Sequence, residues 1–418
     1  MAKSFKERLV GALRWSERYT KTDMVYLAHG GFWLMLGYAA QMISGLILAV
    51  ALANLLPKEN YGTYQFIISF STILGGFTLT GMGTALTRAV AMGSQGALPY
   101  AFRKQLLWST GIAVASGSVA LYYFFNQNYE LGVAFLIAGA CSPFLSGFSL
   151  YRPYLEGKQL FRESTLLGAW RRPLPIIAVG TALFFTEDPM VLVLTYFIAQ
   201  TLSMGLLYKL IIQRYPEPSR EDPELLRYSK HLSVMGMASL VANNLDNVIV
   251  FHFLGAAPVA AYTLAQLPST HLHKMFGLVG KLIFPKFARQ EFEALKESIA
   301  HKVFLFFLAT AGTAAAYWVA APYIFALLFP GYPEAVLLSQ VLILSLLFKS
   351  FMLYGQAFSA HALRGTQYFV QISSGALKLC LLVVLLPLYG LWGAVWAVLA
   401  MSAYWAAALM VLFYTRKI

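Results

Sequence analysis

Three lysines occur in strongly apolar surroundings, where a positive charge needs a specific partner. Lys274, Lys349 and Lys378 each lie near the middle of a long apolar segment. A charge at the centre of a membrane span costs roughly 2.5–3.5 kcal/mol on insertion scales, so it must be paired, hydrated or able to reach the surface. Lysine also binds phosphate groups as a point charge. These positions therefore indicate either ion pairing or the binding of an anion inside a membrane.

Asp246 is the only acidic residue within the predicted spans, and Asn243 lies three residues earlier on the same helical face. One carboxylate neutralises one lysine, so at least two of the three lysines must be hydrated or bind an anion. Asp246 and Asn243 have two interpretations: a structural partner for a lysine, or the site of a coupling ion, Na⁺ or H⁺. The two cysteines, Cys141 and Cys380, are far apart in apolar sequence, so neither a disulfide framework nor a metal site is expected.

Other polar residues extend the faces on which these lysines lie. In the segment that contains Lys274 the polar positions fall within one arc of about 140° at 100° per residue, and such a stripe cannot face lipid. The residues that we expect to contact a bound ligand are Lys274, Lys349, Lys378, Arg171, Arg172, His271, Lys281, Gln371, Gln356 and Gln41. Lys281 lies toward the end of its segment, so it could instead extend to the membrane surface.

Arg171 and Arg172 stand directly before Pro173. A span that began at Pro173 would have only 14 residues before the polar turn at 186–189, which is too short to cross a bilayer. The helix must therefore begin near Ser164, which puts the two arginines about a third of the way into the membrane. Their alternative interpretation is extension to the nearer surface.

The elements that must position these residues are membrane-spanning helices. Hydrophobic residues make up 59% of the 418 and charged residues 12%, and the apolar runs are continuous rather than alternating. Lipid tolerates only helices or closed barrels, so an all-α polytopic fold of about 12 transmembrane helices follows. The spans are predicted near 32–56, 61–82, 103–125, 131–151, 165–186, 190–212, 231–254, 259–284, 303–328, 335–362, 366–387 and 391–414.

A polar, proline-containing stretch divides these spans into six and six. We therefore predict a basic amphipathic surface segment at 1–23, a first lobe at 24–212, a cytoplasmic linker at 213–230 and a second lobe at 231–418. With loops assigned alternately, Lys58 is the only basic residue on the side opposite the termini, so both termini are expected in the cytoplasm. The net charge of +13 then reflects orientation and anionic membrane lipids as partners, and nucleic-acid binding is not expected.

The two halves also resemble each other. Residues 56–64 align without a gap on residues 254–262, at an offset of 198. Residues 155–161 match residues 363–369 at an offset of 208, with Gly, Gln and Phe at equivalent positions. Each match occurs at the same point of the six-helix plan. An even number of helices per half predicts parallel repeats around a central cleft, related by an axis along the membrane normal.

Four segments together resemble a known family: Leu56-Pro-Lys-Glu-Asn-Tyr-Gly-Thr-Tyr64, Gly81-Met-Gly-Thr-Ala-Leu-Thr-Arg88, Leu155-Glu-Gly-Lys-Gln-Leu-Phe161 and Leu245-Asp-Asn-Val-Ile-Val250. Their order and spacing are similar to those of the polysaccharide transporters, or Wzx-type flippases, of the MATE-like MOP exporter superfamily. The resemblance implies a V-shaped two-lobed fold, alternating access and an undecaprenyl-diphosphate-linked oligosaccharide as cargo. It also implies a multi-pass protein of the bacterial inner membrane, with a polysaccharide polymerase and glycosyltransferases as candidate partners.

Under this interpretation the cationic positions hold the diphosphate of the cargo, and aromatic side chains stack on its sugar rings. The aromatic candidates are Trp33, Trp170, Tyr354 and Tyr368. Aromatic residues at membrane interfaces and in helix contacts are the commoner case, so each has that second interpretation.

Three other functions are less consistent with the sequence. A MATE-type drug or cation antiporter needs membrane-embedded acids, and the first six predicted spans have none. A lipid II-type flippase is chemically closer, but that family usually has 14 helices. A membrane enzyme of polysaccharide assembly would need a sizeable outer loop, whereas the predicted outer loops are short, and no nucleophile arrangement or glycine-rich phosphate loop occurs.

The predicted sidedness can be tested with reporter fusions. A reporter active only in the periplasm should be active after Glu59, Glu130 or Asp188 and inactive within residues 217–224. A periplasmic signal from residues 217–224 would contradict the six-plus-six plan, because it would require an odd number of helices before this segment.

Overall fold

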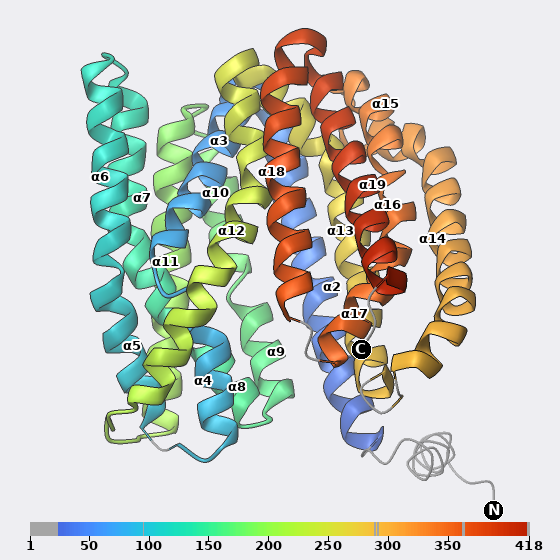
Figure 1. Cartoon of the computed structure of the whole chain (residues 1–418). Helices are drawn as coiled ribbons and strands as arrows, with labels where there is room; N and C mark the ends of the chain where they lie inside the picture. The colour runs from blue at the N-terminus through green and yellow to red at the C-terminus, as the bar shows by residue number, and fades with distance from the viewer. Residues whose placement is uncertain (1–23, 95, 288–289, 291, 362–363, 416–418) are drawn as a thin grey trace, which may run out of the picture.

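The computed structural model describes residues 24–94, 96–287, 290, 292–361 and 364–415, and every regular element among them is a helix. The predicted all-α class is therefore confirmed. The amphipathic segment predicted at 1–23 lies outside the described residues. Figure 1 shows the helices running between two ends of one bundle. We call the end at which α2 begins the lower end, and the end that holds the α2–α3 turn the upper end.

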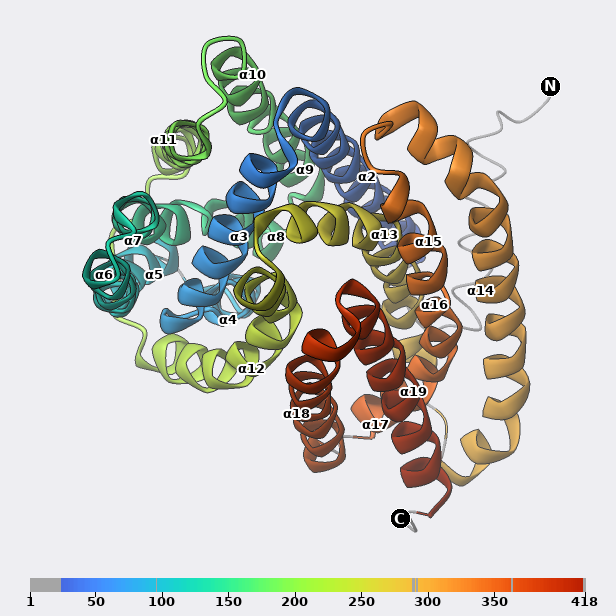
Figure 2. The same cartoon turned by 90° about the horizontal axis from the view of Figure 1, so that it is seen from above.

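Helices that continue one another form six passes in the first half. The elements are α2 (Met24–Leu55), α3 (Lys58–Leu74) with η1 (Gly75–Phe77) and α4 (Met82–Ala91), α5 (Ala97–Trp108) with α6 (Thr110–Phe125), α7 (Tyr129–Phe148) with α8 (Tyr151–Gly157), α9 (Phe161–Trp170) with α10 (Pro173–Ala182), and α11 (Pro189–Arg214). The view from above shows α3 to α11 grouped on one side of the molecule (Figure 2).

Six further passes follow. They are α12 (Pro223–Leu254), α13 (Ala256–Phe287), α14 (Phe292–Leu328), α15 (Pro333–Leu342) with α16 (Ser345–Phe348), η2 (Lys349–Phe351) and α17 (Met352–Ala360), α18 (Arg364–Tyr389) and α19 (Leu391–Thr415). The repeat alignment fits these bounds, because α3 begins at Lys58 and α13 begins 198 residues later, at Ala256.

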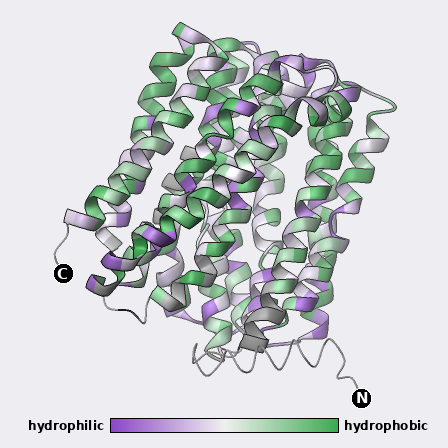
Figure 3. Ribbon diagram, turned by 90° about the vertical axis from the view of Figure 1, so that its right-hand side faces the viewer, coloured by the Kyte–Doolittle hydropathy of each residue, from purple (hydrophilic) through white to green (hydrophobic). Residues whose placement is uncertain are grey.

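Length and hydropathy identify most of these passes as membrane spans. Eight helical segments among the described residues are long and apolar enough, and α3 with α4, bent by 56°, forms a ninth. The passes that do not qualify are α9–α10, which is broken, and α12 and α13, which have 32 residues each but carry many polar side chains. Apolar residues dominate the lengths of the helices in Figure 3, as lipid contact requires.

Local capping signals set the helix starts around the centre of the chain. The side chain of Asp188 accepts a hydrogen bond from Met190 N at the start of α11, and that of Asp222 accepts one from Leu225 N at the start of α12. Each aspartate is followed by a proline, which suits the first position of a helix. Because α12 begins at Pro223, only residues 215–222 are irregular, fewer than in the predicted linker at 213–230.

The irregular stretch is nevertheless fixed to the first half by Glu217. This carboxylate accepts hydrogen bonds from Lys158 Nζ (2.8 Å), the Tyr154 hydroxyl (2.7 Å) and Gly96 N (2.9 Å). Burial by itself raises the pKa of Glu217, but these three donors outweigh it and hold the pKa below its ordinary value. The segment between the two halves is thus anchored at the lower end of the first.

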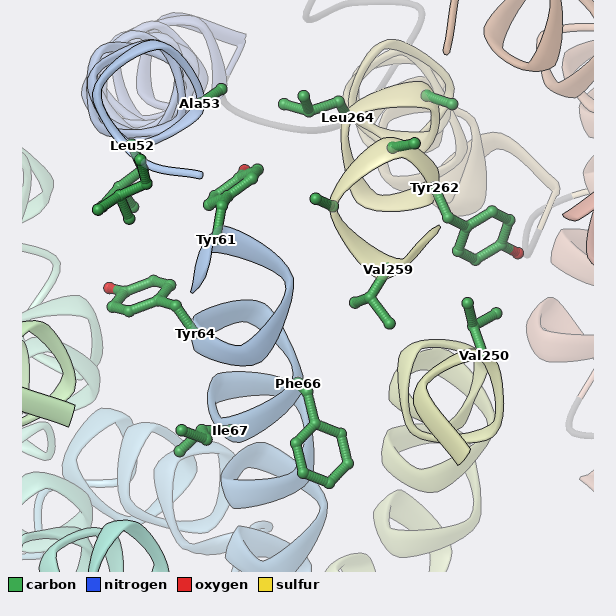
Figure 4. Packing of buried hydrophobic residues seen from close by; sticks show 14 of the residues in the cluster. Leu52, Ala53, Tyr61, Tyr64, Phe66, Ile67, Val250, Val259, Tyr262 and Leu264 are labelled. Carbon is green, nitrogen blue, oxygen red and sulfur yellow. The ribbon is translucent and has the colours of Figure 1, made fainter. Parts of the chain in front are cut away.

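The largest hydrophobic cluster that joins the two halves lies toward the upper end. One cluster joins buried residues of both halves there, among them Tyr61, Phe66, Val250 and Val259 (Figure 4). Toward the lower end two separate clusters form, one around α4, α5, α8 and α11 with the start of α12, and one around α14, α17 and α19. The largest cluster therefore joins the halves above, whereas below the start of α12 packs on the first half and α14, α17 and α19 form a cluster of their own.

Polar contacts reinforce the upper junction. Lys58 Nζ lies 2.6 Å from Glu334 Oε1, and Asn54 Nδ2 donates to the carbonyl of Leu328 over 2.8 Å. The pair of Lys58 and Glu334 is partly exposed, so its contribution to stability is small. Close contacts at glycine residues add to the apolar packing of this junction.

Gly62 is the tightest of these contacts. A Cβ atom built on Gly62 of α3 would overlap the carbonyl group of Ala256 at the start of α13, whereas one built on Gly45 of α2 would meet open space. We therefore expect Gly62→Ala to lower the free energy of unfolding by about 1–3 kcal/mol, the usual cost of overpacking. The melting temperature of the detergent-purified protein measures this loss.

Gly45→Ala is the matched control and should leave the melting temperature unchanged or slightly raised, because alanine favours a helix. Equal melting temperatures for Gly62→Ala and the wild type would contradict the close contact between α3 and α13.

Candidate functional site

An ion pair lies in the buried centre of the second half. Nζ of Lys378 on α18 is 2.6 Å from Oδ1 of Asp246 on α12, and the two side chains are 9% and 5% exposed. Oδ2 of Asp246 accepts hydrogen bonds from the Tyr262 hydroxyl and from Gln266 Nε2, each 3.2 Å long and each from α13. The carboxylate therefore connects three helices, and it compensates the charge of Lys378.

This ion pair is close to the middle of the membrane. Asp246 lies eight residues before the upper end of α12, and Lys378 lies eleven residues before that of α18. At 1.5 Å per residue these separations are about 12 and 17 Å, in a hydrocarbon core about 30 Å thick. Removing either partner leaves the other charge buried and uncompensated, so the pair has a structural role in this conformation.

The next residue of α12 joins the two halves. Asn247 Nδ2 donates a hydrogen bond of 2.8 Å to Ser69 Oγ on α3, and the Thr263 hydroxyl lies 3.4 Å from Asn247 Oδ1. Asn247 was not among the predicted site residues, although it directly follows Asp246 in a polar run of α12. Successive residues of a helix point 100° apart, so Asn247 lies off the helical face that contains Asp246, and a search along that face misses it.

Lys274 and Lys349 have no ion pair among the described residues. Lys274 is exposed on α13, and Lys349 is half-buried where α16 meets η2, with its Nζ 6.0 Å from the ring centroid of Trp405. Lys274 lies 18 residues after the start of α13, which is about 27 Å from the upper end. Lys349 lies 16 residues after the start of α15, which is about 24 Å from the upper end. The two cations therefore share one level, below the ion pair and lower than the mid-depth expected for Lys274 and for Lys349.

The other predicted residues of this region have varied surroundings. The Tyr38 hydroxyl on α2 donates to the His271 carbonyl over 3.2 Å and lies 3.3 Å from its Nδ1, so His271 contacts the first half. Gln41 is exposed on α2, and Gln356 is half-buried on α17. The side chains of Asn243 and Lys281 lie outside the described residues.

A pocket of about 330 Å³ lies between α4 of the first half and α12 and α18 of the second. Its lining residues are Thr80, Gly81, Thr84, Leu232, Gly236, Tyr368 and Gln371. The size is within the range of about 300–1,000 Å³ typical of small-molecule sites. Gln371 and Tyr368 were predicted as binding residues, whereas Thr80 and Thr84 were missed; the break between η1 and α4 that exposes them is encoded by Gly75, Gly76 and Gly81.

The remaining aromatic candidates lie elsewhere. Tyr354 is buried against Phe413, with their ring centroids 5.0 Å apart, and Trp170 is 78% exposed on the first half. Trp33 is partly exposed on α2, with the Arg162 guanidinium 5.8 Å from its ring centroid. Of the four predicted stacking residues, Tyr368 is thus the one that lines the pocket.

The pair Arg171 and Arg172 lies at a break in the fifth pass. Arg171 follows α9 and Arg172 precedes α10, and each of these helices has ten residues. Because α9 begins at Phe161, three residues before the predicted start, the arginines are about 15 Å from either end. They therefore lie at mid-depth, deeper than the sequence indicated.

Comparison with known proteins identifies the family. The profile described as "Polysaccharide biosynthesis protein" matches residues 27–291, well over half of the chain. The chain belongs to this family. No curated protein sequence matches the chain.

Solved structures confirm the fold of this polysaccharide biosynthesis protein. An outward-facing multidrug resistance MATE family transporter of the MOP superfamily aligns with a TM-score of 0.61 at 15% identity, covering 94% of this chain and 95% of the other. An inward-facing multidrug resistance MATE family transporter aligns with a TM-score of 0.62 at 14% identity, covering 90% of this chain and 93% of the other. A third structure is a MOP superfamily transporter from Pyrococcus furiosus, described as having a binding pocket of reversed polarity. It aligns with a TM-score of 0.63 at 14% identity, covering 94% of this chain and 95% of the other.

The family and the fold are thus defined separately. The chain belongs to a family of polysaccharide biosynthesis proteins and has the helical fold of MATE-type transporters. The predicted polysaccharide family and the all-α MATE-like fold class are therefore confirmed. At these identities the solved structures define the architecture alone, so the roles of individual residues have to come from the geometry.

The ion pair of the polysaccharide biosynthesis protein gives a direct test of partner choice. We expect Asp246→Asn to lower the amount of folded protein strongly, because breaking a buried ion pair costs about 3–5 kcal/mol. Adding Lys378→Gln should restore folded protein, since both charges are then removed. Gel filtration of the solubilised protein measures the folded amount.

Asp246→Asn with Lys274→Gln is the matched control, because Lys274 makes no ion pair with Asp246. This double variant should fold no better than Asp246→Asn alone. Equal rescue by both lysine changes would mean that general charge reduction, rather than the contact with Lys378, restores folding.

Proposed function

We propose that this chain moves an undecaprenyl-diphosphate-linked oligosaccharide from the cytoplasmic to the periplasmic leaflet of the bacterial inner membrane, by alternating access between its two lobes. The proposal rests on one observation. After Asp246 has compensated Lys378, Lys274 and Lys349 remain without an ion pair among the described residues, at one level of the second lobe.

Cations without counter-ions are costly in low dielectric, and they persist where water or an anionic ligand reaches them. Lys274 is exposed and thus accessible to a ligand. The charge of Lys274 acts on the neighbouring His271, and the charge of Lys349 acts on His273. A diphosphate carries two or more negative charges, which two lysines complement as point charges. A transporter that serves polysaccharide biosynthesis has a ready cargo of this chemistry in a lipid-linked sugar.

The pocket between α4, α12 and α18 complements the uncharged part of such a cargo. Its polar groups Thr80, Thr84 and Gln371 are neutral hydrogen-bonding side chains, and Tyr368 adds an aromatic ring. Sugars are recognised by hydrogen bonds to hydroxyl groups and by stacking on aromatic rings. We therefore assign the diphosphate to the lysines and the sugars to this pocket.

The direction of access follows from the packing. The lobes share their largest common core toward the upper end, whereas α14, α17 and α19 form a separate cluster toward the lower end, and we infer that the lobes open at the lower end. With the termini in the cytoplasm, as the loop charges favour, the open end faces the cytoplasm, where the lipid-linked cargo is assembled. Reversal of this arrangement, with separation at the upper end, completes transport.

Asp246 is also the candidate site for a coupling ion in the transport cycle. In the conformation described here its carboxylate is occupied by Lys378, Tyr262 and Gln266. It can bind a coupling ion, Na⁺ or H⁺, only when the pair with Lys378 opens. The same occupancy disfavours a cation antiporter, because Asp246 is the one acid within the spans predicted from sequence and is already paired with Lys378.

Neutralising the two lysines tests the proposed role. Lys274→Gln and Lys349→Gln should each lower export of the glycan about tenfold or more, since each removes a charge-assisted contact to phosphate. Folded protein should not fall, because no ion pair is broken. Two measurements decide: folded protein in the membrane, and lipid-linked oligosaccharide reaching the periplasmic leaflet.

The conservative changes Lys274→Arg and Lys349→Arg should keep more export than the glutamine changes, since they keep the charge. Lys209→Gln, at an exposed position on α11, is the control for loss of a surface charge. Folded and fully active glutamine variants at both positions would overturn the role of these cations.

A further inference from the structure

A second cationic site lies inside the first lobe, away from Lys274 and Lys349. Arg171 and Arg172 occupy the break between α9 and α10, at mid-depth. The break is encoded locally, because Pro173 and Pro175 lack the N–H groups that would continue the hydrogen bonds of α9. Two adjacent guanidinium groups at this depth require compensation.

One arginine also completes the broken helix. Arg172 Nε donates a hydrogen bond of 3.0 Å to the carbonyl of Gly168, which α9 leaves without its usual helical partner. This contact fixes the plane of the half-buried guanidinium group. Nη1 of Arg172 and Nε of Arg171 are both inaccessible to water and have no hydrogen-bond acceptor among the described residues.

The hydroxyl of Tyr151 on α8 is a third donor in the same place. Tyr151 is 1% exposed, and its hydroxyl makes no hydrogen bond among the described residues. The charges of Arg171, Arg152, Arg172 and Glu156 all act on the hydroxyl, so these groups belong to its electrostatic surroundings. A buried hydroxyl without a partner costs about 1–3 kcal/mol, which makes its placement beside two unsatisfied arginines costly without an acceptor.

The neighbouring acid does not supply that acceptor. Glu156 pairs with Arg152, with Oε1 2.9 Å from Nε, and no ion pair of the described residues includes Arg171 or Arg172. The site therefore has two uncompensated positive charges and three donors that lack an acceptor. This set matches an oxyanion, which offers several acceptor oxygens and a negative charge.

We propose that Arg171, Arg172 and Tyr151 form an oxyanion-binding site within the first lobe, for a phosphate or carboxylate group of the transported molecule. The site deepens the proposed function, on which its connection to the cargo rests. It provides a binding site for the cargo's negative charge in the first lobe, separate from the lysines of the second lobe. The oxyanion comes either from the diphosphate of the lipid carrier or from an acidic sugar of the glycan.

Anion binding to the purified full chain in detergent tests the site directly. Inorganic pyrophosphate represents the diphosphate and glucuronate represents an acidic sugar, each titrated calorimetrically at low ionic strength. The wild type should bind at least one of them, and the tighter one identifies the source of the oxyanion. Arg171→Gln and Arg172→Gln should each weaken binding about tenfold to a hundredfold, and Tyr151→Phe about threefold to tenfold.

Two further variants separate anion binding at this site from a purely structural role of the arginines. Arg171→Lys keeps a charge and should keep part of the affinity, whereas Arg103→Gln, at an exposed position on α5, should change nothing. A purely structural role would lower the melting temperature of the ligand-free arginine variants without changing anion affinity in the protein that remains folded. Our proposal predicts the reverse, because removing an uncompensated buried charge does not destabilise the fold.

The double variant Lys274→Gln with Lys349→Gln distinguishes failure of this site from failure of the proposed function. It should retain anion binding at Arg171 and Arg172 even where export is lost. Binding that persists in both arginine variants but disappears in the lysine double variant would overturn the site, as would the absence of binding of either anion to the wild type. Loss of binding in the arginine variants with normal export in the lysine variants would keep the site and overturn the role of the lysines.

Discussion

The inability of hydrocarbon to solvate charge or bond to backbone groups is the constraint on which this structure depends. It makes every described element helical, because a helix satisfies its own backbone hydrogen bonds. It also sorts the charged side chains of the spans into two kinds. Lys378 and Asp246 neutralise each other in a buried pair, whereas Lys274, Lys349, Arg171 and Arg172 have no such partner among the described residues. The second kind requires water or a ligand, and this requirement is the basis of the proposed transport function.

The same constraint shapes the contact between the lobes. In lipid, helices associate through close packing of small residues rather than through a hydrophobic driving force. Gly62 and Ala256 provide such packing at the upper end, where aromatic residues of both lobes also meet; the rings of Phe66 and Phe251 stack with their centroids 3.8 Å apart. Toward the lower end α12 instead contacts the first lobe, with Ser233 Oγ accepting from Gly81 N over 2.9 Å. The seventh pass thus contacts both lobes.

Much of the fold could be predicted because its signals are local. Continuous apolar runs identified the helices, and the offset of 198 between the starts of α3 and α13 identified the repeat. Helix ends were predicted less well. The start of α12 depends on Asp222 and Pro223, a capping signal inside a stretch that composition alone marks as a linker. The polar face of α13 was predicted as one stripe, but its residues have different surroundings in the structure. Gln266 contacts Asp246, His271 contacts α2, and Lys274 is exposed.

What the sequence by itself determined was the inventory: helical spans in two similar sets, with one acid among several cations in the predicted spans. These follow from composition and periodicity, which do not depend on how helices are arranged, whereas the family was indicated by the order and spacing of four short segments. Only the tertiary structure decided which lysine Asp246 neutralises, because Lys274, Lys349 and Lys378 are equivalent in a hydropathy profile and differ only in the helix that each faces. It also decided that Tyr151 lies beside Arg171 and Arg172. The partners come from different passes, and their distance depends on packing between helices, which no local pattern of residues encodes.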